Sequence, residues 1–466
     1  MTPPEFAGRW LSDEADMAPF LLDWRRRWQG RALAVAQPDT TDDVATLMRW
    51  CHAHRIPIVP QGGNTGLSGG SVPDGTGRAV VLSLARMRRI RAVDPVNDTL
   101  TVEAGCTLQE VREAAGAAGR LFPLSLAAQG SCTIGGNLAT NAGGVQVLRF
   151  GNARELCLGL EVVTAEGEVW SGLRGLRKDN TGYDLRDLFI GSEGTLGIIT
   201  AAVLKLFPLP ATRLNALVAV PDPQAATQLL GLARRRLSAD LTAFEFFSQT
   251  CMELVRQHVP GATRPLAADS DWYVLLEMSS ADEQASASEA LQDVLAAAFD
   301  QGLAVDAALS QSIAQFEALW ALRENISEAQ GAHGKTIKHD ISLPIPAISD
   351  FIDDVGARLV REHPAHRLVV FGHLGDGNLH YNLSPVAGPG SPEDPAFLAA
   401  EPAINALVHD EVVQRGGSIS AEHGLGILRR DEAARYRSAV ELRLMRAVKQ
   451  ALDPLGLLNP GKLLPA

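Results

Sequence analysis

The chain has 466 residues, of which 46% are hydrophobic and 21% are charged, a composition typical of folded globular proteins. With 42 Lys and Arg against 54 Asp and Glu, its net charge is −12, which argues against binding to nucleic-acid backbones. No apolar run reaches the roughly 18 residues of a membrane span, and residues 1–5 lack the basic start of a signal peptide. We therefore expect a cytoplasmic protein without a transmembrane segment, whose five separated cysteines are reduced.

Short strands and helices alternate along the first half of the chain, after a helical lead-in expected over residues 1–30. The turn at residues 38–41, followed by two acidic residues, indicates a helix that runs through Cys51. Thr107 and Glu110 have the spacing of a capping box and indicate a second helix. Short apolar runs predict strands at 31–36, 56–60, 79–83, 90–93, 100–103 and 198–207.

The last of these strands ends at two prolines, Pro208 and Pro210, and we place a domain boundary there. The pattern beyond it predicts an α+β domain of antiparallel strands with helices on one face. Strands are expected at 214–220, 243–247 and 272–278, and helices at 223–237 and 283–299. The expected organisation is a lead-in (1–30), a first domain (31–208), a second domain (209–450) and a C-terminal tail (451–466).

Three glycine-rich segments follow one another in the first domain. Residues 60–70 contain five glycines after a strand, residues 129–144 are dense in Gly, Ser, Thr and Asn, and residues 191–199 form a third loop. Glycine permits close backbone approach, so that successive N–H groups can converge on an anion. The first loop has neither a Walker A pattern nor G-x-G-x-x-G, and such a loop taken alone is more often a plain structural turn.

In this order and at these separations, the three loops resemble the FAD-binding domain of the vanillyl-alcohol oxidase / para-cresol methylhydroxylase (PCMH) superfamily. The resemblance covers residues 30–208 and implies that the first loop wraps the FAD pyrophosphate. The second would pass the flavin and ribityl chain, and the third would contact the adenosine side. The resemblance returns at residues 459–462, which would come back to the isoalloxazine. The implied fold class is α+β, with a PCMH-type FAD-binding domain and a substrate domain built on an antiparallel sheet.

The resemblance assigns FAD contacts to residues of the three loops and the tail. The expected FAD-binding residues are Pro60, Gly62, Gly63, Asn64, Thr65, Gly66, Leu67, Ser131, Thr133, Gly135, Gly136, Asn137, Asn141, Gly143, Gly144, Glu193, Gly194, Gly197, Ile198, Ile199 and Asn459. Some family members attach FAD through a histidine in the first loop, which this chain lacks, so we expect non-covalent FAD. Cys132 is an alternative thioether site, although a small buried residue is its simpler role.

Two histidines, His373 and His380, flank a tight Gly-Asp-Gly-Asn turn that can bring them together between two strands. Glu422, followed by His423, adds a carboxylate. Two neutral imidazoles and one carboxylate are a usual ligand set for a catalytic divalent metal with an open position. Lone histidines are commonly structural, but this glycine-framed combination favours a site for Zn²⁺, with Mn²⁺, Co²⁺ or Fe²⁺ as alternatives. Its expected ligands are His373, His380 and Glu422.

Residues 210–466 resemble the C-terminal domain of FAD-linked D-2-hydroxyacid dehydrogenases. Nearly the whole chain resembles the D-2-hydroxyglutarate dehydrogenases among them. The resemblance assigns the metal to the same three residues. It also implies that Asn382 and His423 contact the substrate, with His423 as the general base.

A pair of cations is assigned to the substrate by the same resemblance. In that family, residues matching Arg323 and Lys338 bind a substrate carboxylate together with a Thr, which is Ser327 here. Residues 319–327 predict one helix with Arg323 and Ser327 on one face, and residues 336–340 predict a strand. Each cation alone is more often a solvated surface charge. Because two unpaired cations in a buried pocket would be costly for a monocarboxylate, the pair favours a dicarboxylate.

The implied reaction is oxidation of D-2-hydroxyglutarate to 2-oxoglutarate, with hydride passing from C2 to flavin N5 and metal-assisted loss of the hydroxyl proton to His423. The alternatives are a D-lactate or glycolate dehydrogenase of the same architecture, an oxidase that reduces oxygen directly, and a non-catalytic flavin- or metal-binding regulator. Related dehydrogenases pass electrons to electron-transfer flavoprotein or to quinones. The resemblance also suggests a homodimer.

Overall fold

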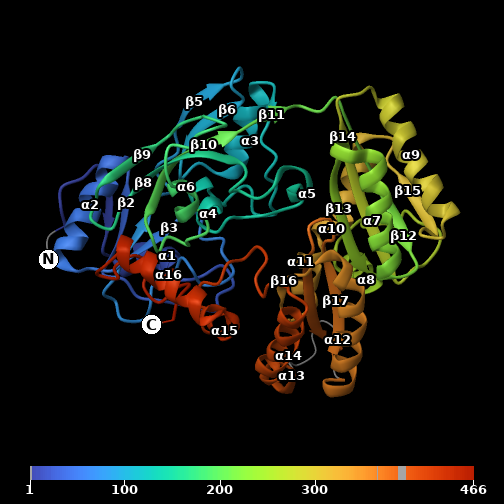
Figure 1. Ribbon diagram of the computed structural model, residues 1–466. Coiled ribbons are helices and arrows are strands. Elements are labelled where there is room, and N and C mark those ends of the chain that lie inside the picture. The colour runs from blue at the N-terminus through green and yellow to red at the C-terminus, as the bar shows by residue number, and fades with distance from the viewer. Residues whose placement is uncertain (1–2, 365, 387–394, 466) are drawn as a thin grey trace. The chain divides into compact units, whose positions relative to one another are not determined.

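The computed structural model describes residues 3–364, 366–386 and 395–465 (Figure 1). The chain forms two compact units. The first consists of Met1–Gly144, Gly151–Leu209 and Glu422–Ala466, and the second of Val145–Phe150 and Pro210–Ala421. Among the described helices, none has the length and apolar character needed to cross a membrane.

A four-stranded sheet opens the first unit, in the order β1–β2–β4–β3, with β1 antiparallel and the other three parallel. Its strands are β1 (Gly8–Leu11), β2 (Ala34–Pro38), β3 (Ile58–Gln61) and β4 (Val80–Ser83). Helix α2 (Thr41–His54) follows β2 and is capped by Thr40, whose side chain accepts a hydrogen bond from the Asp43 N–H. The apolar face of α2 is buried against β2, β3 and β4. The strands and helix predicted here are therefore confirmed, apart from small shifts of their ends.

The expected helical lead-in is only partly helical. Helix α1 (Glu14–Leu21) buries Met17 and Leu21 in a small apolar cluster, but the chain before it forms strand β1. Pairing with β2 satisfies the backbone groups of this segment. Trp10 meets the ring of Trp50 edge-on, with centroids 5.7 Å apart. The prediction was wrong because an apolar anchor such as Trp10 suits a strand as well as a helix.

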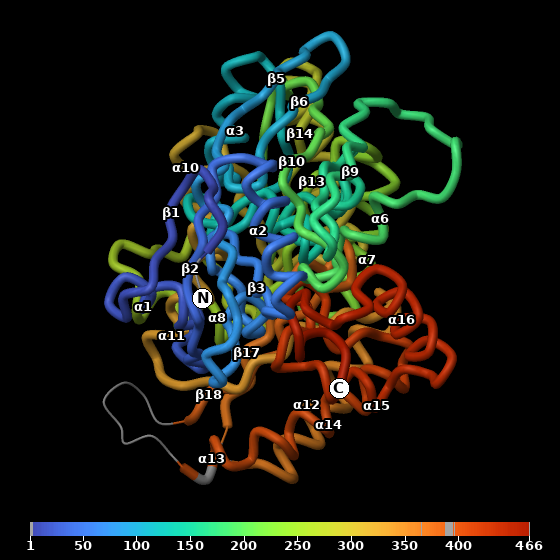
Figure 2. The backbone as a smooth tube through the Cα atoms, turned by 90° about the vertical axis from the view of Figure 1, so that its left-hand side faces the viewer, coloured from blue at the N-terminus to red at the C-terminus, as the bar shows by residue number. Residues whose placement is uncertain are grey.

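A five-stranded antiparallel sheet completes the first unit, in the order β5–β6–β10–β8–β9. Its strands are β5 (Ile90–Asp94), β6 (Thr99–Glu103), β8 (Cys157–Val163), β9 (Val169–Gly172) and β10 (Ile198–Lys205). The accompanying elements are α3 (Leu108–Ala117), α4 (Ile134–Ala139), α6 (Leu185–Phe189), α15 (Arg430–Tyr436), α16 (Ala439–Leu452) and a ribbon of β7 (Arg120–Leu121) with β11 (Phe207–Pro208). The predicted capping box at Thr107 is present at the start of α3. Figure 2 shows the chain between β9 and α6 as a wide green loop.

The second unit is built on a seven-stranded sheet in which every neighbouring pair is antiparallel, in the order β15–β12–β14–β13–β17–β18–β16. Its strands are β12 (Thr212–Val220), β13 (Leu241–Ser248), β14 (Trp272–Ser280), β15 (Asp306–Leu309), β16 (Asp340–Ser342), β17 (His366–His373) and β18 (Asn378–Pro385). This sheet confirms the predicted antiparallel α+β architecture.

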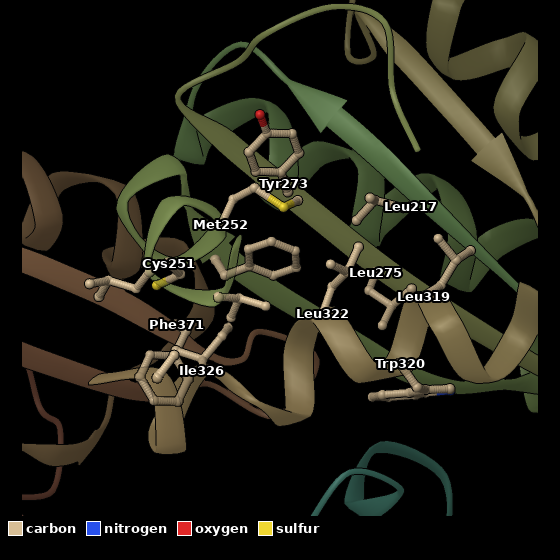
Figure 3. Close-up of a cluster of buried hydrophobic side chains, with 14 of the residues drawn as sticks. Leu217, Cys251, Met252, Tyr273, Leu275, Leu319, Trp320, Leu322, Ile326 and Phe371 are labelled. Carbon is tan, nitrogen blue, oxygen red and sulfur yellow. The ribbon is translucent and has the colours of Figure 1, made fainter. Parts of the chain in front are cut away.

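Helices cover both faces of this sheet, whereas the sequence predicted them on one. Helices α8 (Gln249–His258), α10 (Ile313–Glu324) and α11 (Ile326–His333) contribute to the apolar cluster of Figure 3, on the face of Phe371. On the other face, Phe351 of α12 (Ile348–Glu362) packs on Tyr381, and α12 contacts α7 (Pro223–Leu237), which contacts α9 (Gln284–Asp300). The remaining elements are α5 (Val147–Phe150), α13 (Pro395–Ala399), α14 (Glu401–Gln414) and the 3-10 turns η1 (Ser238–Asp240) and η2 (Ile345–Ala347). Continuously buried strands such as β13 need a cover on both faces.

The unit boundaries differ in part from the predicted domains. The break after Leu209 lies next to the predicted boundary. However, the last stretch of the first unit begins at Glu422, well before the predicted tail at 451, and the short segment Val145–Phe150 belongs to the second unit. Sequence reasoning missed both passages because neither is marked by a run of prolines or charges.

Candidate active site

A pocket in the first unit collects the three glycine-rich loops. The predicted FAD-binding residues that line it are Pro60, Gly62, Gly63, Asn64, Thr65, Gly66, Thr133, Gly135, Gly136, Asn137, Glu193, Gly194, Gly197, Ile198 and Ile199. The predicted residues that lie outside this lining, within the described chain, are Leu67, Ser131, Asn141, Gly143, Gly144 and Asn459. Cys132 and His423 also line the pocket.

The residues of this pocket fit a bound FAD. A Cβ on Gly63 would lie 1.8 Å from the carbonyl oxygen of Ser131, so the first and second loops can approach this closely only with glycine at position 63. The hydroxyl of Thr133 is buried at the pocket wall, and within the described residues it has no hydrogen-bond partner. Because an unpaired buried hydroxyl is costly, a ligand atom that bonds to Thr133 would stabilise the site.

The C-terminal tail holds the loops through their backbones. Asn459 donates to the carbonyl oxygens of Gly70 and Glu193 at 2.9 and 2.8 Å. Lys462 donates to two carbonyl oxygens within residues 69–72 at 3.0 and 2.7 Å, and burial lowers its pKa to about 8. The side-chain NH2 group of Asn459 therefore links the first and third loops. The predicted contact of Asn459 with FAD stays a prediction.

His423 is held at the wall of the same pocket. The hydroxyl of Ser68 donates to the His423 carbonyl oxygen at 3.1 Å. Shortly after His423 in the chain, Leu425 and Gly426 donate their N–H groups to the Glu193 carboxylate at 2.8 Å each. Burial raises the pKa of this carboxyl group. The first and third loops therefore fix the backbone around His423.

In the second unit, the hairpin of β17 and β18 places His373 and His380 on one face of the sheet. His373 lies opposite Asn378, and His380 lies opposite Phe371. The two imidazole centroids are 6.0 Å apart. The turn needs glycine at Gly377, which has φ +86° and where a Cβ would lie 2.4 Å from a backbone oxygen. The predicted meeting of the two histidines is confirmed.

Glu245 is a residue of this region that sequence reasoning missed. It lies opposite His373 in the pairing of β13 with β17 and is fully buried. His373 Nδ1 lies 2.7 Å from Glu245 Oε1, and Arg323 Nε lies 2.8 Å from Oε2. Burial tends to raise the pKa of this carboxyl group, but its contacts with His373 and Arg323 hold it below its ordinary value. A lone acidic residue within the apolar strand 243–247 was the available signal, because buried carboxylates need partners.

A second missed carboxylate, Asp340, lies beside His380. Asp340 pairs with His380 across β16 and β18, and Oδ1 lies 3.8 Å from His380 Nδ1. The Ala421 N–H donates to the Asp340 carbonyl oxygen at 3.1 Å. Glu422 follows Ala421 directly. Glu422 thus begins the last stretch of the first unit, and the next residue, His423, lines the glycine-loop pocket.

Two of the predicted substrate residues, Arg323 and Ser327, lie on two successive helices. The helix predicted over 319–327 is interrupted at Asn325, which separates α10 from α11. Arg323, on α10, is buried over the Phe371 ring at 4.9 Å, whereas Ser327, on α11, is exposed. The prediction of one unbroken helix was therefore wrong, whereas the substrate role of Arg323 and Ser327 stays a prediction.

The other two predicted substrate residues lie near β16 and β18. Lys338 is half-buried on the irregular stretch before β16, where the predicted strand is reduced to a single bridge at Ile337. Asn382 is buried, accepts from the His339 N–H and donates to Gln330, each at 3.0 Å. These bonds hold the Asn382 side chain within its own unit.

Comparisons with known proteins agree with both units. A family model described as the FAD binding domain matches residues 32–172, and one described as FAD linked oxidases, C-terminal domain, matches residues 209–463. Mitochondrial D-2-hydroxyglutarate dehydrogenase of Bos taurus is 42% identical over 458 residues, covering 98% of this chain and 81% of the relative. D-2-hydroxyglutarate dehydrogenase of Xanthomonas citri pv. viticola is 41% identical, covering 98% and 94%.

A more distant relative and two solved structures complete the comparison. A mitochondrial protein of Schizosaccharomyces pombe with a provisional D-lactate dehydrogenase name is 35% identical, covering 97% of this chain and 85% of the relative. Substrate-bound p-cresol methylhydroxylase has a TM-score of 0.74 at 17% identity, over 97% and 93% of the two chains. An alkyldihydroxyacetonephosphate synthase has a TM-score of 0.74 at 16% identity, over 97% and 83%. The structural likeness confirms the PCMH-type fold, and the sequence matches show that the chain belongs to the FAD-linked D-2-hydroxyacid dehydrogenases.

Proposed function

We propose that this FAD-dependent dehydrogenase oxidises D-2-hydroxyglutarate to 2-oxoglutarate with the help of a divalent metal. The observation that carries the proposal is the meeting of His373 and His380 on one sheet face, with imidazole centroids 6.0 Å apart, in a chain whose glycine loops line one pocket. Glu422 is the third predicted metal ligand, and His423 lines the pocket of the glycine loops. The names of relatives about 40% identical over nearly the whole chain support the substrate.

The donor set fits a divalent metal. His373 and His380 offer imidazole nitrogens from one sheet face. Glu422 is the predicted source of a carboxylate. Two imidazoles and a carboxylate suit Zn²⁺, and also Mn²⁺, Co²⁺ or Fe²⁺. When bound, the metal would supply a Lewis acid and FAD a hydride acceptor.

The side chains of this protein would bind and deprotonate the substrate. His423 would accept the hydroxyl proton, because its imidazole can act as a general base and lies at the pocket wall. Arg323 and Lys338 would meet the distal carboxylate, with a planar fork and a point charge respectively. Asn382 would contact the substrate, and Ser327 would add a hydroxyl from α11. The glycine loops would hold FAD without a covalent bond.

A D-lactate dehydrogenase is the second candidate, and one contact favours it. Arg323 is ion-paired with Glu245, so its charge is balanced inside the protein. Arg323 is therefore not an unpaired cation, and the argument against a monocarboxylate substrate becomes weaker. The relative with a provisional D-lactate dehydrogenase name belongs to the same comparison.

Anaerobic reduction of the flavin distinguishes these functions. The purified yellow protein would be mixed with D-2-hydroxyglutarate, D-malate, D-lactate and the L-enantiomers, and the loss of the flavin band would be followed in a stopped-flow instrument. Fastest bleaching by D-2-hydroxyglutarate is expected. Faster bleaching by D-lactate would replace the proposed substrate, and no bleaching by any acid would favour a regulator.

The same reduced protein, given electron-transfer flavoprotein, a quinone or oxygen, would identify the electron acceptor. Light scattering would test the expected homodimer. Cell fractionation would test the proposed cytoplasmic location.

A further inference from the structure

The carboxylate of Glu245 contacts two functional side chains at once. Its Oε1 lies 2.7 Å from His373 Nδ1, and its Oε2 lies 2.8 Å from Arg323 Nε. His373 comes from β17 and Arg323 from α10, so one side chain on β13 links a strand to a helix. We propose that Glu245 is a positioning residue that fixes which nitrogen of His373 is available for a metal. This inference rests on the metal-dependent function proposed above.

The tautomer follows from the hydrogen bond. An ionised carboxylate can only accept a hydrogen bond, so the contact at 2.7 Å requires the proton on His373 Nδ1. The lone pair of the neutral ring then lies on Nε2. In metal sites, a histidine ligand commonly donates its other ring N–H to a carboxylate in this way, which orients the ring and makes the ligand nitrogen more basic.

Arg323 allows this carboxylate to remain buried and ionised. Glu245 is fully buried, and a buried carboxylate without a cationic partner is strongly unfavourable. Arg323 supplies that positive charge and is itself stacked over Phe371 at 4.9 Å. The position of the acceptor for His373 is therefore set by packed groups on both sides.

The test compares two buried glutamates. Glu245→Gln keeps the shape but removes the charge and allows the side chain to donate as well as accept. Glu277→Gln is the matched control, because Glu277 is also buried, lies on the same sheet face on neighbouring β14, and pairs with Arg213 at 3.0 Å and Trp320 at 2.8 Å. Zn²⁺ affinity would be measured by competition with a chromophoric chelator. The tautomer would be measured by NMR of metal-free protein carrying ¹⁵N-histidine, with His373 assigned from His373→Gln.

We expect the metal-free protein to show His373 protonated on Nδ1. Glu245→Gln should lose this single tautomer and bind Zn²⁺ about 10- to 100-fold more weakly, while Glu277→Gln should match the unsubstituted protein in both measurements. The proposal is overturned if His373 carries its proton on Nε2, if Glu245→Gln changes neither measurement, or if both variants weaken Zn²⁺ equally. The NMR measurement on the unsubstituted protein tests the proposal even where Glu245→Gln does not fold. Failure of the flavin to bleach with any hydroxy acid would instead reject the proposed function.

Discussion

Replacing Gly63 by alanine should release FAD without unfolding the protein. The added Cβ would lie 1.8 Å from the carbonyl oxygen of Ser131 and 2.8 Å from its carbonyl carbon. Both are backbone atoms, and no real Cβ approaches other heavy atoms closer than about 3.0 Å, so the first and second loops must separate by about 1 Å. Overpacking of this kind typically costs about 1–3 kcal/mol. If the strain is released on the FAD-free form, the affinity for FAD falls by about 5- to 150-fold.

The assay for this variant is the flavin content of the purified protein, followed by the dissociation constant for FAD from flavin fluorescence. Gly75→Ala is the control, because a Cβ there meets nothing within 4 Å and Gly75 lies outside the pocket lining. The melting temperature of the two FAD-free variants should be similar. Retention of FAD by Gly63→Ala at the level of Gly75→Ala would refute the argument that the loops need this close contact.

Two further predictions concern the metal and the tail. His380→Ala and Glu422→Ala should each lose bound metal, measured by elemental analysis, and lose turnover while keeping FAD, and retention of metal by both would reject this ligand set. Lys462 should make the protein more stable at alkaline pH. Its folded pKa is about 8 against an ordinary value of 10.5, so between these values the unfolded chain binds more protons and the unfolding free energy rises with pH, by about 3 kcal/mol. Urea titrations at both ends of this pH window should show this rise in the unsubstituted protein but not in Lys462→Met. An equal pH dependence in Lys462→Met would exclude Lys462 as the source.

Local signals predicted the elements whose ends carry their own capping chemistry. Helix α7 is predicted over residues 223–237 and observed as Pro223–Leu237. Asp222 precedes it and accepts a hydrogen bond from the Ala225 N–H at 2.7 Å, and Pro223 suits the first turn. The hairpin of His373 and His380 could also be predicted from a local signal, because its glycine turn lies between the two residues that it brings together.

Long-range contacts account for what the sequence did not reveal. The break at Asn325 is not marked by proline or glycine, and it separates Arg323 from Ser327 where an unbroken helix would join them. The return of the chain at Glu422 depends on bonds of the following residues to Glu193, far away in the sequence. No local pattern around residue 422 indicates these partners.

The role of Arg323 shows why charge counting from sequence misleads for a buried site. Arg323 and Lys338 counted as two free cations only while their surroundings were unknown. A single acidic residue in the continuously buried strand β13 implies a buried cationic or donor partner, and Arg323 is that partner for Glu245. A substrate carboxylate at Arg323 would therefore meet a cation whose charge is already balanced by Glu245. Its binding would be strengthened less by electrostatic attraction than by the fixed orientation of the guanidinium group. Selection of a dicarboxylate over a monocarboxylate then depends more on Lys338 and on the shape of the pocket than on the number of arginines and lysines.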